Sequence, residues 1–196
     1  MHRTLDEQKL ARLCAEQDRQ AQEELYTRYA ARLFTLCLRY SDSPDEAQDL
    51  LHDAFLKTFE NISSYHYQGT GSLFAWISRI AINTALSNIS RYKLRFQLLD
   101  ISRPDPLPEP TDEAFSLISI EKLLEFISKL PDTQRAIFNM FCLDGYSHRE
   151  IAAQLGISER GSTSMLAKAK NRLKKQINEY IKNSERNETS GRKNQG

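Results

Sequence analysis

Apolar residues recur at three- and four-residue intervals through most of the chain, which is the spacing of one face of an α-helix. Between residues 19 and 40 the repeat consists of Leu25, Tyr29, Leu33, Leu36 and Tyr40. The 196 residues include seven glycines and six prolines, gathered in a few places, and no segment alternates apolar and polar residues as a strand does. The pattern therefore predicts an all-α protein.

A predicted helix over residues 44–60 carries an acidic face. Ser43 as the N-cap and Glu46 at the third helical position form a strong start signal. The face opposite the apolar one has His52 at its edge and Leu56 in its middle. An acidic face is commonly only solvated, whereas a leucine exposed within it indicates that another protein docks there. Both interpretations stay open. The acids of this face are Asp45, Glu46, Asp49, Asp53 and Glu60.

Residues 61–72 form a polar loop rich in aromatic residues, followed by a predicted helix from Ser72 to about Phe96. Tyr65, His66 and Tyr67 suit stacking on unpaired bases, because every base offers a π-face. The alternative is packing on the domain beneath, which we expect for at least one of them. An outer stripe of the helix suits a nucleic acid, although its tryptophan equally fits the core. The stripe contains Ser72, Trp76, Arg79, Asn83, Ser87 and Ser90, followed by Arg91, Lys93 and Arg95.

Residues 99–114 differ sharply in composition from their surroundings. Five acids oppose a single arginine, and four prolines alternate along the segment, which excludes a helix and favours an extended chain. We interpret it as an acidic linker between a helical domain at residues 1–98 and a second one at residues 115–183. The polar tail at residues 184–196 lacks apolar residues and is predicted to be disordered.

The second predicted domain contains a helix-turn-helix pattern. Ser147 and Glu150 have the spacing of a capping box at the start of a helix. Gly156 supplies a left-handed residue that ends this helix, and Ser158 is the N-cap of the next one. The capped helix, the glycine and the tight turn together indicate a DNA-binding motif.

The helix after this turn has two distinct faces. Leu166, Ala169, Leu173 and Ile177 point inward at helical spacing, and residues 160–182 contain seven basic residues and one acid. Such a face suits the DNA major groove, where cations hold phosphates and polar tips reach base edges. The alternative is a solvated amphipathic helix with a lysine-rich end. The outward residues are Arg160, Ser164, Lys168, Asn171 and Lys175.

Composition limits the remaining functions. The net charge of +1 conceals segregated acids and bases, and no run approaches the roughly 20 apolar residues of a membrane span. The N-terminus lacks the apolar core of a signal peptide. Cys14, Cys37 and Cys142 are widely spaced in apolar surroundings and predict buried free thiols in a reducing, cytoplasmic compartment. Because phosphate loops, paired carboxylates and metal-ligand spacings are missing, we expect a binding protein without cofactor or metal, rather than an enzyme.

Taken together, the segments between residues 19 and 181 resemble the extracytoplasmic-function (ECF) sigma factors of bacterial RNA polymerase. Residues 45–57 (DEAQDLLHDAFLK) are similar to the region-two helix that docks on the polymerase β′ coiled coil. Residues 74–83 (FAWISRIAIN) are similar to the helix that reads and melts the −10 element. Residues 130–138 (LPDTQRAIF) and 145–152 (GYSHREIA) are similar to the start of region four, whose helix-turn-helix binds the −35 element.

The resemblance implies partners and site residues. Core RNA polymerase, through its β′ coiled coil and β flap, and promoter DNA are the implied partners, with an anti-sigma factor as a further one common in the family and no membrane insertion. The implied polymerase-binding residues are Asp49, His52, Asp53 and Leu56. The implied −10 residues are Tyr65, Trp76, Arg79 and Asn83. The implied −35 residues are Arg160, Thr163, Ser164, Lys168, Asn171 and Lys175.

Three positions depart from the family's usual pattern. His52 stands where the family usually has glutamine, and Thr163 replaces a basic recognition residue. Ser162 places a hydroxyl where an apolar residue normally fills the core. The departures leave the expected fold intact but do not allow the −35 sequence preference to be inferred.

A sigma factor is therefore the first functional hypothesis. The second is a stand-alone transcription regulator with a helix-turn-helix and a helical sensor or dimerisation domain, and the third is an all-helical enzyme. The acidic face of residues 45–57 together with the aromatic loop separates the first two, because a repressor needs neither.

Overall fold

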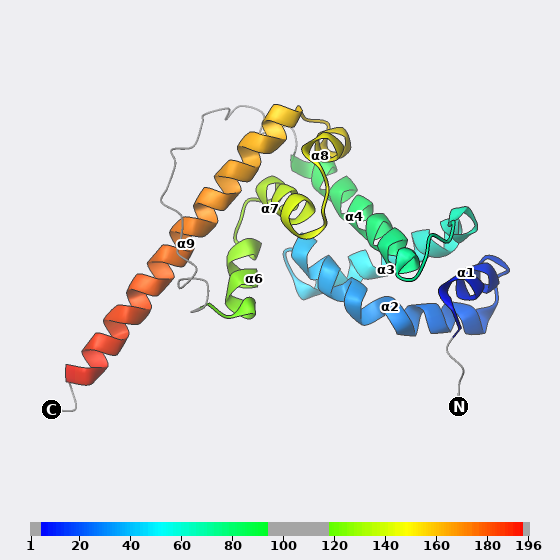
Figure 1. Cartoon of the computed structure of the whole chain (residues 1–196), viewed down its shortest axis with the longest axis horizontal. Coiled ribbons are helices and arrows are strands. Elements are labelled where there is room, and N and C mark those ends of the chain that lie inside the picture. The colour runs from blue at the N-terminus through cyan, green and yellow to red at the C-terminus, as the bar shows by residue number, and fades with distance from the viewer. Residues whose placement is uncertain (1–4, 94–117, 194–196) are drawn as a thin grey trace. The chain divides into compact units, whose positions relative to one another are not determined.

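The computed structural model describes residues 5–93 and 118–193, and every regular element in these two ranges is helical. The chain divides into two compact units, residues 1–91 and residues 92–196 (Figure 1). The predicted all-α fold with two helical domains is thus confirmed. The predicted linker at residues 99–114 lies outside the described residues. Within the described ranges, no helix is long and apolar enough to cross a membrane.

The first unit contains α1 (Glu7–Ala15), α2 (Arg19–Tyr40), α3 (Pro44–Asn61), the short 3₁₀ helix η1 (Ile62–Ser64) and α4 (Ser72–Lys93). The apolar repeat predicted for residues 19–40 is buried in α2 at every position. Leu25 and Leu33 of α2 and Leu73 and Ile77 of α4 are all fully buried. Burial of these stripes is the main stabilising contribution, since short helices are marginal alone.

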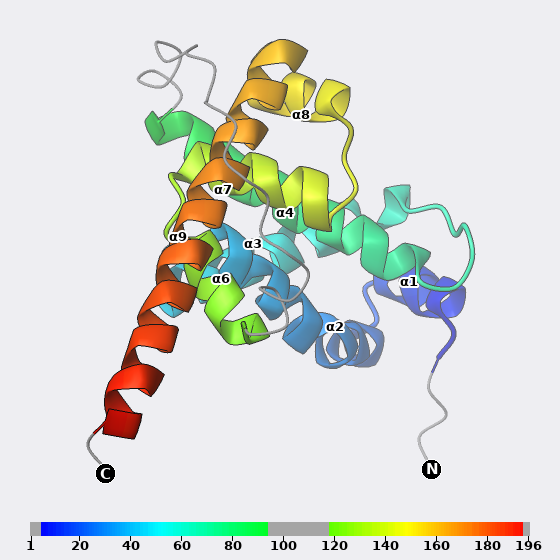
Figure 2. The ribbon, with the colours of Figure 1, turned by 60° about the vertical axis from the view of Figure 1, so that its left-hand side comes forward.

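Sequence patterns predicted no element before residue 19, yet α1 is part of this core. Asp6 caps the helix by accepting a 2.7 Å hydrogen bond from the backbone N–H of Lys9. Leu10 and Cys14 are fully buried one turn apart. The helix lies beside η1 and the loop that leads to α4 (Figure 2).

The second unit contains α6 (Ile120–Ser128), α7 (Asp132–Phe138), the π turn η2 (Asn139–Leu143), α8 (His148–Leu155) and α9 (Glu159–Lys193). The helices α6, α7 and α8 pack against α9, the long helix at the C-terminus (Figure 1). A cluster of Phe126, Ile127 and Leu130 on one side and Ala169, Leu173 and Ile177 of α9 on the other forms its core. The buried Arg135 is held by the Ser128 carbonyl oxygen at 3.0 Å and by Asp132 at 3.2 Å.

One prediction for this unit, the burial of Cys142, is wrong. The helix α9 continues to Lys193, into the segment for which the sequence predicted a disordered tail. Once a helix has been nucleated by packing, each further residue adds a hydrogen bond, even where apolar side chains are absent. Cys142 is exposed, unlike Cys14 and Cys37, because it belongs to the π turn. The extra residue per turn changes which side chains face inward, and an apolar pattern does not reveal this change.

Candidate nucleic-acid and partner-binding surfaces

The acidic face of α3 is present as predicted. Ser43 caps the helix by accepting from the backbone N–H of Glu46, and the residues Ala47, Leu51, Ala54, Phe55 and Thr58 are buried beneath. Asp49 and Asp53 are exposed one turn apart, and the side chain of Leu56 is 61% exposed. His52 is exposed as well, with its Nε2 atom 3.1 Å from Nε2 of Gln48. Two carboxylates and one apolar side chain are therefore exposed together on a helix whose opposite side is buried.

The aromatic loop before α4 is divided between packing and exposure. Tyr65 is half-buried, its hydroxyl lies 2.5 Å from Oγ of Ser72, and its ring centroid is 5.5 Å from that of Trp76. Burial raises the pKa of Tyr65, so the phenol stays protonated. Tyr67 is 44% exposed, and His66 is exposed. Packing on the domain, expected for at least one of these aromatics, thus applies to Tyr65, and Trp76 is likewise half-buried.

A groove that the sequence did not predict lies between α1 and the segment from η1 into the aromatic loop. Its volume is about 680 Å³. Lys9 and Arg12 line it from α1, and the three aromatic residues Tyr65, His66 and Tyr67 line it from the loop. Two cations, Lys9 and Arg12, and one carboxylate, Asp6, therefore line the same groove as three aromatic residues. Cations together with aromatic rings are the combination used to bind single-stranded nucleic acids.

The outer stripe of α4 is exposed in its central part. Arg79 and Asn83 are exposed one turn apart, and Trp76 lies on the same side one turn earlier. Ser87 donates a hydrogen bond to the Asn83 carbonyl oxygen at 2.8 Å. Arg95, the last residue of the predicted stripe, lies outside the described residues.

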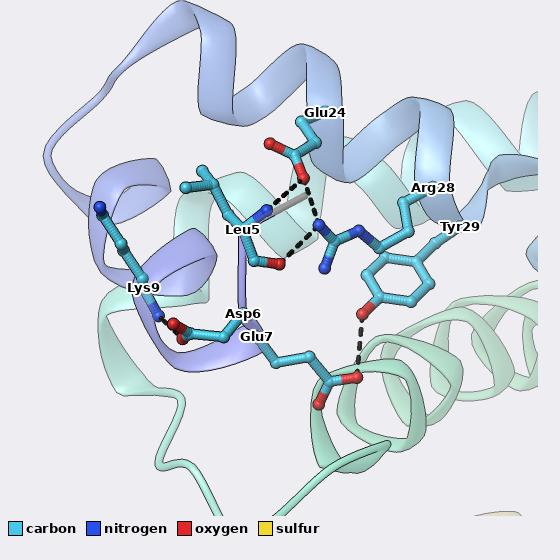
Figure 3. Close-up of polar contacts among 7 residues, drawn as sticks. All are labelled: Leu5, Asp6, Glu7, Lys9, Glu24, Arg28 and Tyr29. Atoms are coloured by element: carbon cyan, nitrogen blue, oxygen red, sulfur yellow. Dashed lines mark hydrogen bonds and ion pairs between the residues drawn. The ribbon is translucent and has the colours of Figure 1, made fainter. Parts of the chain in front are cut away.

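Glu7, which sequence patterns did not identify, joins α1 to α2 and α4. Its Oε1 atom accepts a 3.0 Å hydrogen bond from the hydroxyl of Tyr29 on α2 (Figure 3). Its Oε2 atom accepts from the backbone N–H groups of Gly71 at 2.9 Å and Leu73 at 3.2 Å, at the start of α4. The cap at Asp6 and the spacing of Leu10 and Cys14 were the signals for α1, but no local pattern pairs Glu7 with residues more than 60 positions away.

The helix-turn-helix of the second unit has the predicted local geometry. Ser147 and Glu150 form both bonds of a capping box, and Gly156 ends α8 with a φ of 66°, in the left-handed region. Ser158 accepts a hydrogen bond from the backbone N–H of Gly161 at 3.0 Å, as an N-cap does. Ile151 and Leu155 are buried. These contacts fix the turn between the two helices.

The outward face of α9 is accessible along its first four turns. Arg160, Thr163 and Lys175 are exposed, and Ser164, Lys168 and Asn171 are half-buried. The Thr163 hydroxyl donates to the Glu159 carbonyl oxygen at 3.0 Å. The predicted −35 residues therefore share one side of one helix.

Ser162 fills a buried position by pairing with a histidine of the preceding helix. It is fully buried, and its Oγ lies 2.9 Å from Nδ1 of His148 at the start of α8. The His148 ring stacks on Phe141 at a centroid distance of 4.4 Å. A buried hydroxyl with a partner avoids the desolvation penalty of an unpaired one, so this departure is accommodated without loss of the motif.

Two family descriptions match the chain. Residues 25–95 match sigma-70 region 2, and residues 120–173 match region 4 of sigma-70. The ECF RNA polymerase sigma factor SigM of Mycobacterium tuberculosis is 29% identical over 156 residues, which cover 80% of this chain and 76% of that protein. The RNA polymerase sigma factor YlaC of Bacillus subtilis is 28% identical over 160 residues, covering 79% and 91%.

A solved structure supports the same fold. The sigma factor RpoE of Bartonella quintana, in complex with the anti-sigma factor NepR, matches with a TM-score of 0.50 and 19% identity. The match covers 78% of this chain and 94% of RpoE.

Proposed function

The chain belongs to the ECF sigma factors of bacterial RNA polymerase, and on this premise we propose how its surfaces divide the recognition of polymerase and promoter. It is a non-enzymatic subunit of transcription initiation that acts with core RNA polymerase and promoter DNA. The match to region 2 at residues 25–95 favours this function over a stand-alone regulator.

The acidic face of α3 docks on the β′ coiled coil of core polymerase. Asp49 and Asp53 are exposed one turn apart, and they attract basic groups of the partner. Leu56 supplies the apolar anchor, since its side chain is 61% exposed within a charged face. His52 lies at the edge of this contact. The exposed leucine one turn beyond these two carboxylates is the observation that carries the proposal.

The −10 element is read by the surface formed by the aromatic loop and α4. Tyr65 and Trp76 pack on each other and form a firm base, so they support a captured nucleotide from beneath. Arg79 and Asn83 present a cation and an amide on the exposed side of α4. A nucleotide leaving the stack enters the groove beside Tyr65, where the cations of α1 neutralise its phosphate.

The −35 element is bound by the outward face of α9, with Lys175 holding a phosphate. Arg160, Thr163, Ser164, Lys168 and Asn171 form the part of this face that reaches base edges. The second unit also meets the β flap of polymerase. RpoE of Bartonella quintana forms a complex with an anti-sigma factor, and we expect a regulator of the same class to bind the present chain. We also expect the present chain to act in the cytoplasm.

Promoter opening tests this function, because the separate DNA-reading surfaces require polymerase to hold them in register. Permanganate reactivity of unpaired thymines is measured on a linear promoter with the chain alone, core polymerase alone, and both. We expect reactivity only in the mixture, lost when Tyr65 and Asn83 are replaced with alanine. Reactivity with the chain alone would contradict the proposal, because the chain would then melt DNA unaided.

A further inference from the structure

The start of α4 is capped by a residue of another helix. The first N–H groups of an α-helix have no partner within the helix and carry a partial positive charge. At α4 the N–H groups of Gly71 and Leu73 both donate to Oε2 of Glu7, at 2.9 Å and 3.2 Å. A carboxylate acceptor makes such bonds stronger than a neutral one does. The position at which α4 begins is therefore set from α1.

Glu7 is itself held firmly. The hydroxyl of Tyr29 donates to its other oxygen, and burial raises the pKa of Tyr29, with the bond to Glu7 raising it further, so that this donor keeps its proton. The backbone of Leu5 is fixed on both sides, because its N–H donates to Glu24 at 3.1 Å and its carbonyl oxygen accepts from Arg28 at 2.7 Å (Figure 3). Glu24 and Arg28 also form an ion pair with each other.

Gly71 and Leu73, whose N–H groups Glu7 caps, lie where the aromatic loop passes into α4. At its beginning, Tyr65 contacts Ser72, and the backbone N–H of Gln68 donates to the same Ser72 hydroxyl at 3.2 Å. At its end, Glu7 fixes Gly71. The loop therefore has both ends attached to one point, the first turn of α4. A shift of that turn would move the loop, the groove and the stripe of Arg79 and Asn83 relative to one another.

We propose that Glu7 is a positioning residue for the −10 element: its carboxylate sets the first turn of α4 and thereby places the aromatic loop for capture of an unstacked base. This inference rests on the proposed function. Glu7 acts through Gly71 and Leu73 and does not contact DNA. A base-capturing site displaced by about 1 Å loses much of its affinity, because stacking and hydrogen bonding depend on short distances.

Two conservative variants separate the reach of the side chain from its charge. Glu7→Gln keeps an oxygen at the same distance and loses the charge, whereas Glu7→Asp keeps the charge and is one methylene too short to reach both N–H groups. Glu7→Ala removes both. The full-length proteins are bound to core polymerase, and their affinity is measured for single-stranded oligonucleotides carrying a matched or a mismatched −10 sequence.

We expect Glu7→Ala to weaken binding of the matched oligonucleotide about ten- to thirty-fold, a factor that corresponds to the loss of about one charge-assisted hydrogen bond. Glu7→Gln should stay within about three-fold of the wild type, and Glu7→Asp should lie between Gln and Ala. The ratio of matched to mismatched affinity should fall in the same order, while core binding stays unchanged. Glu23 is an exposed carboxylate on α2, and Glu23→Ala is therefore the control for loss of charge.

The proposal is overturned if Glu7→Asp discriminates the −10 bases as well as the wild type, or if the variants lose core binding in proportion to oligonucleotide binding. Should Glu7→Ala fail to fold, the Gln and Asp variants decide alone. If the wild-type chain does not open a promoter with core polymerase, the proposed function is contradicted. If the wild type opens the promoter and the Glu7→Asp variant discriminates the −10 bases equally well, only the role of Glu7 is contradicted.

Discussion

Replacing Leu56 with alanine is expected to weaken binding to core polymerase about five- to thirty-fold without unfolding the first unit. The Leu56 side chain is 61% exposed, so more than half of its surface remains for a partner to bury. Full burial of a leucine contributes roughly 1.5–3 kcal/mol, and the exposed part therefore roughly 1–2 kcal/mol. The part already buried accounts for a loss of stability of about 1 kcal/mol, which is too small to unfold an ordinary domain.

Fluorescence anisotropy of the labelled chain titrated with core polymerase measures the dissociation constant, and urea unfolding measures the stability. Leu38→Ala is the matched control, because Leu38 is 39% exposed and lies on α2 rather than on the acidic face of α3. Its dissociation constant should stay within about two-fold of the wild type. An unchanged dissociation constant for Leu56→Ala, or equal losses in both variants, would refute the docking of this face.

Three further outcomes are expected. Changing Asp49 and Asp53 together to lysine should abolish co-purification with core polymerase while helicity by circular dichroism stays unchanged. Retained binding would contradict docking through the acidic face of α3. Lys175→Ala should weaken binding to every DNA sequence and flatten its salt dependence, whereas Arg160→Ala should alter the selected motif and cost about 1–3 kcal/mol on the best site; identical motifs from a selection would show that another face enters the groove. At about pH 8 a thiol reagent should label Cys142 well before Cys14 and Cys37, because Cys142 is exposed and the other two are buried. Burial raises the pKa of all three thiols, to about 11 at Cys14 and about 12 at Cys37, so access decides the order; equal rates by mass spectrometry would contradict this.

Sequence patterns predicted the helices because their apolar stripes and caps are local signals. The repeat in α2, the N-cap at Ser43 and the capping box at Ser147 involve residues within a few turns of one another, and all three are present in the structure. The same holds for the left-handed Gly156. These features require no knowledge of how distant segments meet.

The misses come from contacts between distant segments and from changes of helical register. Glu7 has no role that its neighbours in sequence reveal, because its partners are Tyr29, Gly71 and Leu73. The packing of Tyr65 likewise depends on Trp76, eleven residues further along the chain, and no local pattern pairs the two rings. The groove arises from two segments some 50 residues apart, so its lining has no linear signature.

The pairing of Ser162 with His148 has an evolutionary consequence. Either residue alone is unfavourable: a buried serine without a partner costs desolvation, and a histidine facing an apolar residue at position 162 loses its hydrogen bond. The two positions therefore form an epistatic pair, in which the effect of one substitution depends on the residue at the other. A variant that acquires an apolar residue at 162 is expected to tolerate or require a change at 148, and a helix α9 transplanted between relatives should be moved together with its own residue 148.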